Sequence, residues 1–211
     1  MSDKSPMARP IVRKMARRKE ESLAGLIRQI VKPGERLTGA EVGVASGALS
    51  EFLLREFASA GLMLYMVDLW KPFAEDSDYF KSGDKMARMT ARDMDLMFLE
   101  VVHRTEEWAH RTVIHRCDTV EAAATILKYH GVGCLDFCFL DADHSEAGVR
   151  RDLAAWWPLV RPGGWFTGHD YGHRRYGGVK VAVDDFLAQV AGAAPVVLPG
   201  QVWAHRKEVA T

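Results

Sequence analysis

Acidic side chains recur along the chain, each within or just after an apolar run that has the length of a β-strand. The five acids of this series are Glu41, Asp68, Asp118, Asp141 and Asp170. In an open parallel sheet, ligands bind beyond the carboxyl ends of the strands, so these side chains are expected to converge on one site. Because uncompensated carboxylates repel one another and are costly to bury, the site is expected to bind a cationic ligand or a metal ion.

A glycine-containing loop follows the first of these acids and indicates the class of ligand. Its pattern is Glu41-x-Gly43-x-x-x-Gly47, with Ala45 where a dinucleotide-binding loop has its second glycine. An acid two residues before the first glycine would repel a pyrophosphate, but it would attract a ligand that carries an ammonium and a sulfonium. The loop alone is a weak signal and needs support from the residues after the next two strands.

Residues after the second and third predicted strands fit a nucleoside. Asp68 ends the second strand, where its carboxylate can accept hydrogen bonds from both hydroxyl groups of a ribose. Trp70 is expected to wall the adenine pocket, and Asp118 and Thr119 follow the third strand near an adenine edge. Together with the glycine loop, these residues predict a site for a positively charged ligand that contains adenosine.

A histidine three residues after Asp141 is the candidate general base. His144 follows the fourth predicted strand, and an imidazole with an ordinary pKa of about 6.5 can accept a hydroxyl proton at neutral pH. The alternative is that His144 is a loop residue before Ser145, which can cap the next helix. Asp143 is expected to orient His144 or to cap that helix.

The composition excludes several classes of protein. The 211 residues have a mass of 23.6 kDa, 48% of them are hydrophobic, and 28 basic side chains balance 28 acidic ones. These values are typical of one globular domain and argue against a chain that mainly coats nucleic acid or an anionic membrane. No apolar run approaches the roughly 20 residues of a membrane helix. The three cysteines lack a CxxC pair, which favours a reducing cytoplasm over a disulfide framework or a zinc site.

The neutral total hides an uneven distribution of charge. Residues 1–19 hold seven basic side chains and one acid, so this basic head carries +6 and the remainder −6. The head is expected to be a mobile or partner-packing tail, and contact with RNA phosphates is the alternative. With the helix that follows, it forms a basic N-terminal segment over 1–34. Residues 35–211 are expected to form the main domain, with a helical insertion at about 71–110.

The alternation of apolar runs and helical patterns predicts a wound α/β sheet with helices on both faces. Strands are expected at 38–44, 62–68, 112–116, 135–140, 165–167, 196–198 and 202–204. The last two are expected to form an antiparallel hairpin at the sheet edge. Helices are expected at about 23–31, 48–60, 85–110, 120–129, 146–160 and 179–190. The methionines of the third helix favour packing, with a lid over a substrate as the alternative.

Four motifs of the chain resemble the class I S-adenosylmethionine-dependent methyltransferases. They are Glu41–Gly47, Val67–Trp70, Phe139–Ser145 and Arg161–Tyr171. The resemblance covers roughly residues 35–207, and the last two motifs are similar to macrocin-type and other sugar O-methyltransferases, akin to the metal-dependent catechol type. It implies a Rossmann-like seven-stranded sheet of order 3-2-1-4-5-7-6 whose seventh strand is antiparallel.

The resemblance also assigns contacts to S-adenosylmethionine. It implies that Gly43 and Gly47 lie against the methionine part, Asp68 on the ribose and Asp118 near the adenine amine. Glu41 is expected to hold the methionine end together with the glycine loop.

A metal site is a further implication of the resemblance. In metal-dependent relatives the first aspartate after the fourth strand is a ligand, and here this residue is Asp141. Asp141 is also expected to line the cofactor pocket and to take part in catalysis. The other ligands follow the fifth strand, where His169 and Asp170 stand in place of two oxygen donors. Because Mg²⁺ prefers oxygen ligands, three alternatives stay open: Mg²⁺ held by the two aspartates, a softer ion such as Mn²⁺, or no metal. His144 takes the position of a lysine in catechol-type relatives.

The resulting prediction is an S-adenosylmethionine-dependent O-methyltransferase that acts on a hydroxyl of a sugar, a phenol or a natural product. The alternative is an S-adenosylmethionine-binding module or RNA-associated methyltransferase that uses the basic head. A nicotinamide dehydrogenase is disfavoured by the glycine spacing. We expect a cytoplasmic protein with a small-molecule partner and without nucleic acid or membrane partners, which could form a homodimer through its head and first helix.

Overall fold

The computed structural model describes residues 8–81 and 85–209. Within these ranges, the side chains of residues 8–17 and of Asp78 are outside the description. Of the basic head, the side chains of Arg18 and Lys19 are therefore described.

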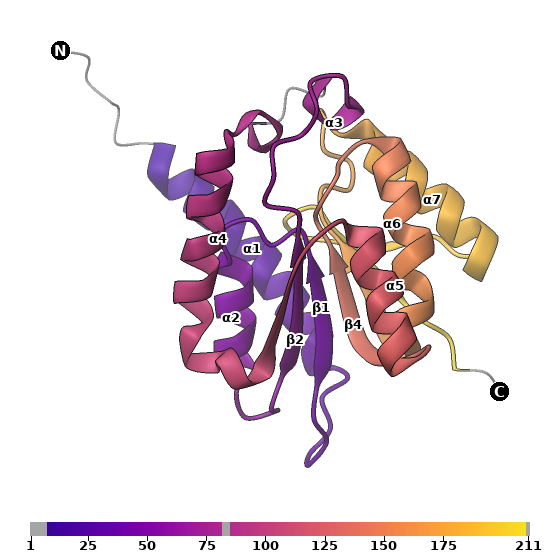
Figure 1. Ribbon diagram of the computed structural model, residues 1–211. Coiled ribbons are helices and arrows are strands. Elements are labelled where there is room, and N and C mark those ends of the chain that lie inside the picture. The colour runs from indigo at the N-terminus through magenta and orange to yellow at the C-terminus, as the bar shows by residue number, and fades with distance from the viewer. Residues whose placement is uncertain (1–7, 82–84, 210–211) are drawn as a thin grey trace.

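A seven-stranded mixed sheet forms the centre of the protein (Figure 1). Its strands are β1 (Thr38–Val42), β2 (Met63–Asp68), β3 (Thr112–Arg116), β4 (Leu135–Leu140), β5 (Val160–Gly168), β6 (Val196–Leu198) and β7 (Val202–Arg206). The spatial order is β3-β2-β1-β4-β5-β7-β6, and β7 runs antiparallel to both of its neighbours. The predicted strand order and the antiparallel seventh strand are confirmed.

The five parallel strands bring their carboxyl ends to one edge of the sheet. β1 pairs with β2 and β4, while β2 pairs with β3 and β4 pairs with β5. The chain order therefore reverses between β1 and β4. At such a switch point the connections after the two strands lead away from each other and leave room for a ligand.

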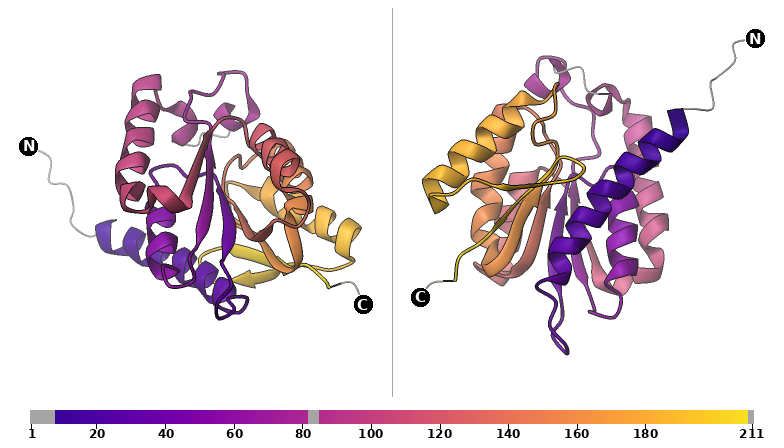
Figure 2. Two further views of the ribbon diagram at one scale, coloured as in Figure 1. Left: turned by 60° about the horizontal axis from the view of Figure 1, so that its bottom comes forward. Right: turned by 180° about the vertical axis from the view of Figure 1, so that it is seen from behind.

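Helices cover both faces of the sheet (Figure 2). One face carries α1 (Ala8–Arg28), α2 (Ala48–Glu56) and α4 (Ala91–Thr105), and the other carries α5 (Thr119–His130), α6 (Glu146–Trp156) and α7 (Gly177–Ala191). Each layer closes its own apolar core. β4 supplies Phe137 and Phe139 to the first core and Cys138 and Leu140 to the second, as expected for a strand that is buried on both faces.

None of the helices in the described ranges is both long enough and apolar enough to span a lipid bilayer.

α1 is a continuous helix whose apolar face packs onto the sheet. Leu23, Ala24 and Ile27 are completely buried in the first core. Nearer the helix start, the Ser22 hydroxyl donates to the carbonyl of Pro199 at 2.8 Å. A Cβ on Gly200 would lie 2.7 Å from the backbone nitrogen of Lys19, so helix and hairpin turn are in close contact. This packing fixes Lys19 beside the β6–β7 turn, at the carboxyl edge of β5.

The insertion between β2 and β3 consists of several short helices. They are α3 (Asp78–Lys81), the 3₁₀ turn η1 (Met86–Arg88), α4, and the 3₁₀ segment η2 (Glu106–Arg111), which leads into β3. The Thr90 hydroxyl accepts from the amide of Asp93, whose carboxylate accepts from the amide of Thr90. This capping box begins α4 at Ala91, so the expectation of one helix over 85–110 was wrong. A last 3₁₀ turn, η3 (Trp157–Leu159), similarly ends α6 earlier than expected.

Candidate functional site

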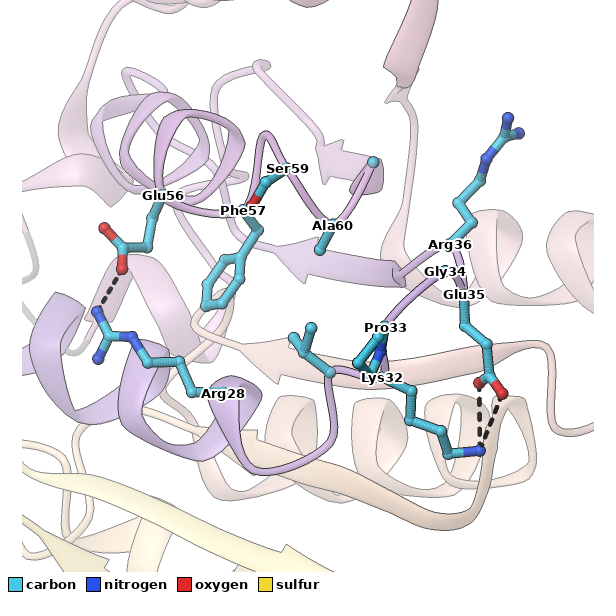
Figure 3. Close-up of a pocket in the computed structure, with 12 residues that line it drawn as sticks. Arg28, Lys32, Pro33, Gly34, Glu35, Arg36, Glu56, Phe57, Ser59 and Ala60 are labelled. Atoms are coloured by element: carbon cyan, nitrogen blue, oxygen red, sulfur yellow. Dashed lines mark hydrogen bonds and ion pairs between the residues drawn. The ribbon is translucent and has the colours of Figure 1, made fainter.

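Two depressions lie at opposite ends of the sheet. The cleft at the carboxyl ends has a volume of about 350 Å³, within the usual range for small-molecule sites. Predicted site residues that line it are Glu41, Gly43, Asp68, Asp118, Thr119, Asp141 and His144. A wider depression of about 620 Å³ lies at the amino ends, between the end of α1, the loop before β1 and the end of α2 (Figure 3). The predicted chemistry therefore collects in the smaller, more enclosed cleft.

The glycine loop and the loop after β4 touch at Gly43. Its φ is +93°, and a Cβ would lie 2.1 Å from the carbonyl oxygen of Asp141. Gly47, with φ +77°, is the N-cap of α2, where a Cβ would lie 3.1 Å from Val101. Both positions require glycine, and the close approach at Gly43 leaves bare backbone along the floor of the cleft. This is the kind of cradle that the methionine part of S-adenosylmethionine would need.

Asp68 holds the glycine loop from the end of β2. Its carboxylate accepts hydrogen bonds from the amides of Ala45 at 2.9 Å and Trp70 at 3.0 Å. Burial raises the pKa of this carboxyl and outweighs the opposing effect of the backbone bonds. The carboxylate lines the cleft, where its remaining acceptor positions can receive ribose hydroxyls.

Trp70 lies in the first core and does not line the cleft. Its φ of +40° turns the side chain inward, where the indole packs at 5.2 Å on the ring of Phe98. The indole nitrogen donates to the carbonyl of Ala45 at 2.9 Å. In this geometry Trp70 supports the glycine loop from below, while Leu69 faces the cleft.

Glu41 is buried at the base of the glycine loop, with 2% of its surface exposed. The Ser50 hydroxyl of α2 donates to Oε2 of Glu41. Burial raises the pKa of Glu41 to about 8, against the opposing effects of Ser50 and Lys19. The carboxyl is therefore mostly protonated at neutral pH, and a cation nearby would favour its ionised form.

Asp118 and Thr119 form the start of α5 at the far end of the cleft. Asp118 is the N-cap and accepts from the amide of Val120 at 2.9 Å, and it also pairs with Arg151 at 3.2 Å. The Thr119 hydroxyl donates to Asp152, whose pKa burial raises to about 7. These contacts fix the wall that the sequence assigned to adenine.

Two aspartates and two histidines meet at the other end of the cleft, where Asp141 and His144 line it and His169 and Asp170 lie behind them. Nε2 of His144 lies 3.4 Å from Oδ1 of Asp141 and 3.1 Å from Oδ2 of Asp170. Nδ1 of His169 lies 3.4 Å from Oδ1 of Asp141 and 3.2 Å from Oδ2 of Asp170. Each imidazole thus bridges both carboxylates. We refer to these four residues as the acid–imidazole cluster.

Charge within the cluster is strongly coupled. Burial would lower the pKa of His169, but the carboxylates of Asp141 and Asp170 outweigh it and raise the pKa to about 9. Burial would raise the pKa of Asp141, but Lys19 and His169 hold it well below its ordinary value. Asp170 has a φ of +57°, a strained conformation that turns its buried carboxylate toward the histidines.

The ligand atoms of Asp141, His144 and Asp170 all lie within 4.8 Å of one another. This spacing suits a divalent ion, and it differs from the predicted set because His144 stands where His169 was expected. His169 contacts the same carboxylates from the side of β5.

Lys19 is a site residue that the sequence analysis assigned only to the basic head. Its Nζ donates to Oδ2 of Asp141 at 2.9 Å, and it lines the cleft. Burial would lower the pKa of Lys19, but Asp141, Glu41 and Asp170 outweigh it and raise the pKa. A sequence signal existed, because Lys19 precedes the buried Leu23 by one helical turn and therefore shares its face.

Aromatic and methionine side chains from the insertion and from the loop between β5 and α7 surround the cluster. The ring of Tyr176 lies 4.5 Å from that of His144, and Tyr79 lies 5.8 Å from it on edge. The insertion contributes further apolar side chains to the cleft, which are Phe73, Met86, Met94 and Met97. Met94 is also buried in the first core, so the methionines both pack and face the cleft.

Comparisons with known proteins show the family and the fold of the chain. A family profile described as a methyltransferase domain matches residues 40–171. The solved O-methyltransferase NovP has a TM-score of 0.66 and 16% identity, over 91% of this chain and 80% of that one. Calicheamicin methyltransferase CalS11 has a TM-score of 0.66 and 14% identity, over 96% and 87%. MycE methyltransferase of the mycinamycin pathway, solved with Mg, SAH and mycinamycin VI, has a TM-score of 0.50 and 18% identity, over 82% of this chain and 45% of that one. No curated protein sequence gives a significant match.

Proposed function

We propose, from the premise that the chain belongs to the methyltransferase domain family, that it transfers the methyl group of S-adenosylmethionine to a hydroxyl of a small molecule. One observation carries the proposal: a single cleft extends from the wall at Asp118 and Thr119, across the glycine loop, to the two cluster residues Asp141 and His144. S-adenosylmethionine supplies an electrophilic methyl group on a sulfonium, and the cluster lies at the end from which an acceptor oxygen would approach.

The glycine loop and three acids would bind the cofactor. Gly43 and Gly47 admit the methionine part to bare backbone, and Glu41 beneath them favours its ammonium. Asp68 accepts from the ribose hydroxyls while its amide contacts keep the loop rigid. Asp118, fixed as the cap of α5, would border the adenine amine.

His144 would accept the proton of the acceptor hydroxyl. An imidazole between two carboxylates is well suited to this role, because Asp141 and Asp170 stabilise the imidazolium that forms. In an in-line displacement, the acceptor oxygen forms the new C–O bond as the C–S bond breaks, and the proton moves to His144. Holding both partners in this geometry supplies much of the acceleration.

The acceptor end favours a ring-shaped acceptor. Tyr79, Tyr176 and the methionines offer aromatic and adaptable apolar surfaces around one polar cluster. A sugar, a phenol or a larger natural product fits this chemistry. The same class is supported by the activities of the O-methyltransferase NovP, the calicheamicin methyltransferase CalS11 and the methyltransferase MycE of the mycinamycin pathway.

A divalent ion would be held by Asp141, His144 and Asp170, and it would lower the pKa of an acceptor hydroxyl. The spacing of these three donors would suit Mg²⁺ or Mn²⁺. The ammonium of Lys19, however, already contacts Asp141, and this positive charge makes the site unsuited to a metal ion. No step of the proposed reaction therefore uses a metal.

Calorimetric titration with S-adenosylmethionine tests the cofactor, and mass spectrometry of its demethylated product tests turnover with a panel of phenols and sugars. We expect binding between about 1 µM and 1 mM. His144→Gln should keep that binding and lose roughly a hundredfold or more in turnover. His103→Gln, an exposed histidine of α4, is the matched control and should change neither. An absence of cofactor binding, or equal turnover in both variants, would contradict the proposal.

A further inference from the structure

Lys19 joins α1 to the acid–imidazole cluster through a largely buried ion pair. Its Nζ lies 2.9 Å from Oδ2 of Asp141, and the two side chains are 23% and 13% exposed. The same ammonium lies over the Phe139 ring of β4, 5.8 Å from its centre. It faces the cleft that holds the predicted acceptor site.

Both oxygens of Asp141 already have partners. Oδ2 accepts from Lys19, and Oδ1 lies 3.4 Å from both His144 and His169. A divalent ion on Asp141 would need one of these oxygens at about 2.1 Å. The ammonium would then stand within a few ångströms of a second positive charge, in surroundings that screen charge poorly.

The backbone of Lys19 is held in place independently of this pair. Leu23 and Ala24 are fully buried one turn later, Ser22 bonds to Pro199, and Gly200 contacts the Lys19 backbone directly. Only a rotation of the lysine side chain, with loss of the ion pair, could vacate Asp141. A helix anchored in this way delivers its ammonium to one place.

We propose that the ammonium of Lys19 replaces a divalent metal ion at this site. It takes the position on Asp141 that a divalent ion would need, so the protein works without a metal. This inference rests on the proposed function for the role of the ammonium in the reaction. There it faces the acceptor oxygen and stabilises the negative charge that grows as the proton leaves.

Titration with Mn²⁺, followed by the electron paramagnetic resonance signal of the free ion, tests the inference without S-adenosylmethionine or an acceptor. We expect the wild type to bind Mn²⁺ weakly. Lys19→Met keeps the length of the side chain but removes its charge, and it should bind Mn²⁺ roughly tenfold or more tightly. The double variant Lys19→Met with Asp141→Asn should lose this gain, because the carboxylate that would hold the ion is gone.

Two further variants separate charge from folding. Lys32→Met removes an exposed lysine beyond the end of α1, paired with Glu35, and should leave Mn²⁺ affinity unchanged. Lys19→Arg keeps a cation and should bind Mn²⁺ as weakly as the wild type. Tight Mn²⁺ binding by the wild type, or no gain in Lys19→Met with native circular dichroism, would overturn the inference. Because the titration contains no methyl donor, failure of the proposed function would appear separately as a lack of cofactor binding.

Discussion

Ion pairs occur at both ends of the sheet, but in different surroundings. At the amino ends, Arg28 pairs with Glu56 and Lys32 with Glu35, on side chains that are 34% to 63% exposed (Figure 3). At the carboxyl ends, the pair of Lys19 and Asp141 is mostly buried and is connected to two histidines. Exposed pairs contribute about 0–1 kcal/mol because water screens them, whereas buried charges depend strongly on one another.

The difference shows that the size of a depression does not identify a functional site. The amino-end depression is the larger of the two, yet its two ion pairs are open to solvent. The carboxyl-end cleft is smaller, but it lies at the switch point between β1 and β4 and gathers buried acids, bare backbone and a helix N-terminus. Substitutions of the same type at the two ends should therefore have very different effects.

Glycine replacement should give the largest contrast. Gly43→Ala adds a Cβ 2.1 Å from the carbonyl of Asp141 at φ +93°, so it should cost about 3–5 kcal/mol in stability and about a hundredfold or more in cofactor affinity. Gly34→Ala, at φ +78° with nothing within 4 Å, should cost only about 1 kcal/mol and leave affinity unchanged. Urea denaturation and calorimetry measure both, and equal effects would contradict the assignment of the cleft.

A buried acid should give the next contrast through pH. The pKa of Glu41 is about 8 in the folded protein, above the ordinary 4.5, so the folded state keeps a proton that the unfolded chain loses. The free energy of unfolding should therefore fall as pH rises from about 4.5 to 8, by on the order of 4 kcal/mol from this group. Glu41→Gln should remove that contribution and raise stability at pH 8.

Glu56→Gln is the control at the other end. It replaces an exposed acid paired with Arg28 and should change stability by less than about 1 kcal/mol at any pH. Urea denaturation at pH 5, 6.5 and 8 compares the two variants. A stability of Glu41→Gln that follows the wild-type pH profile would show that Glu41 is ionised in the fold.

Asp68 should give the next contrast between the ends, measured as affinity for the cofactor. Asp68→Asn keeps an oxygen for only one of the two amides, because Ala45 donates to Oδ2 and Trp70 to Oδ1, and it loses the charge that would accept two ribose hydroxyls. Affinity for S-adenosylmethionine should therefore fall roughly 10- to 100-fold. Glu35→Gln at the amino end should bind like the wild type. Calorimetry measures both affinities, and an unchanged Asp68→Asn would remove the ribose assignment.

The fold could be read from the sequence because its signals are local. The run Leu135–Leu140 is apolar throughout, which marks a strand buried on both faces, and the turn at Gly200 marks the edge hairpin. Acids at strand ends then converge, because parallel pairing leaves them no other edge. The break before α4 was missed because its signal is a capping box at Thr90, which competes with apolar periodicity.

The site was read less completely, because two of its features depend on packing between distant segments. Trp70 stands next to the ribose acid in sequence, but its φ of +40° turns it into the core. Lys19 belongs to a basic run, and its role follows only from the way in which α1 crosses the turn at Gly200. The position of Lys19 one turn before Leu23 was the available signal, but its role could be recognised only once its partner Asp141, directly after β4, was known.

The smallest effect is expected for the ion pair of Arg28 and Glu56. A double-mutant cycle with Arg28→Ala and Glu56→Ala should give a coupling energy below about 1 kcal/mol, since both side chains are open to water. The same cycle with Lys19→Met and Asp141→Asn should give a larger coupling, because each change leaves a buried charge without its partner. Equal coupling energies at the two ends would mean that water reaches the acid–imidazole cluster freely. The ion pairs of the two ends would then differ in their arrangement but not in their strength.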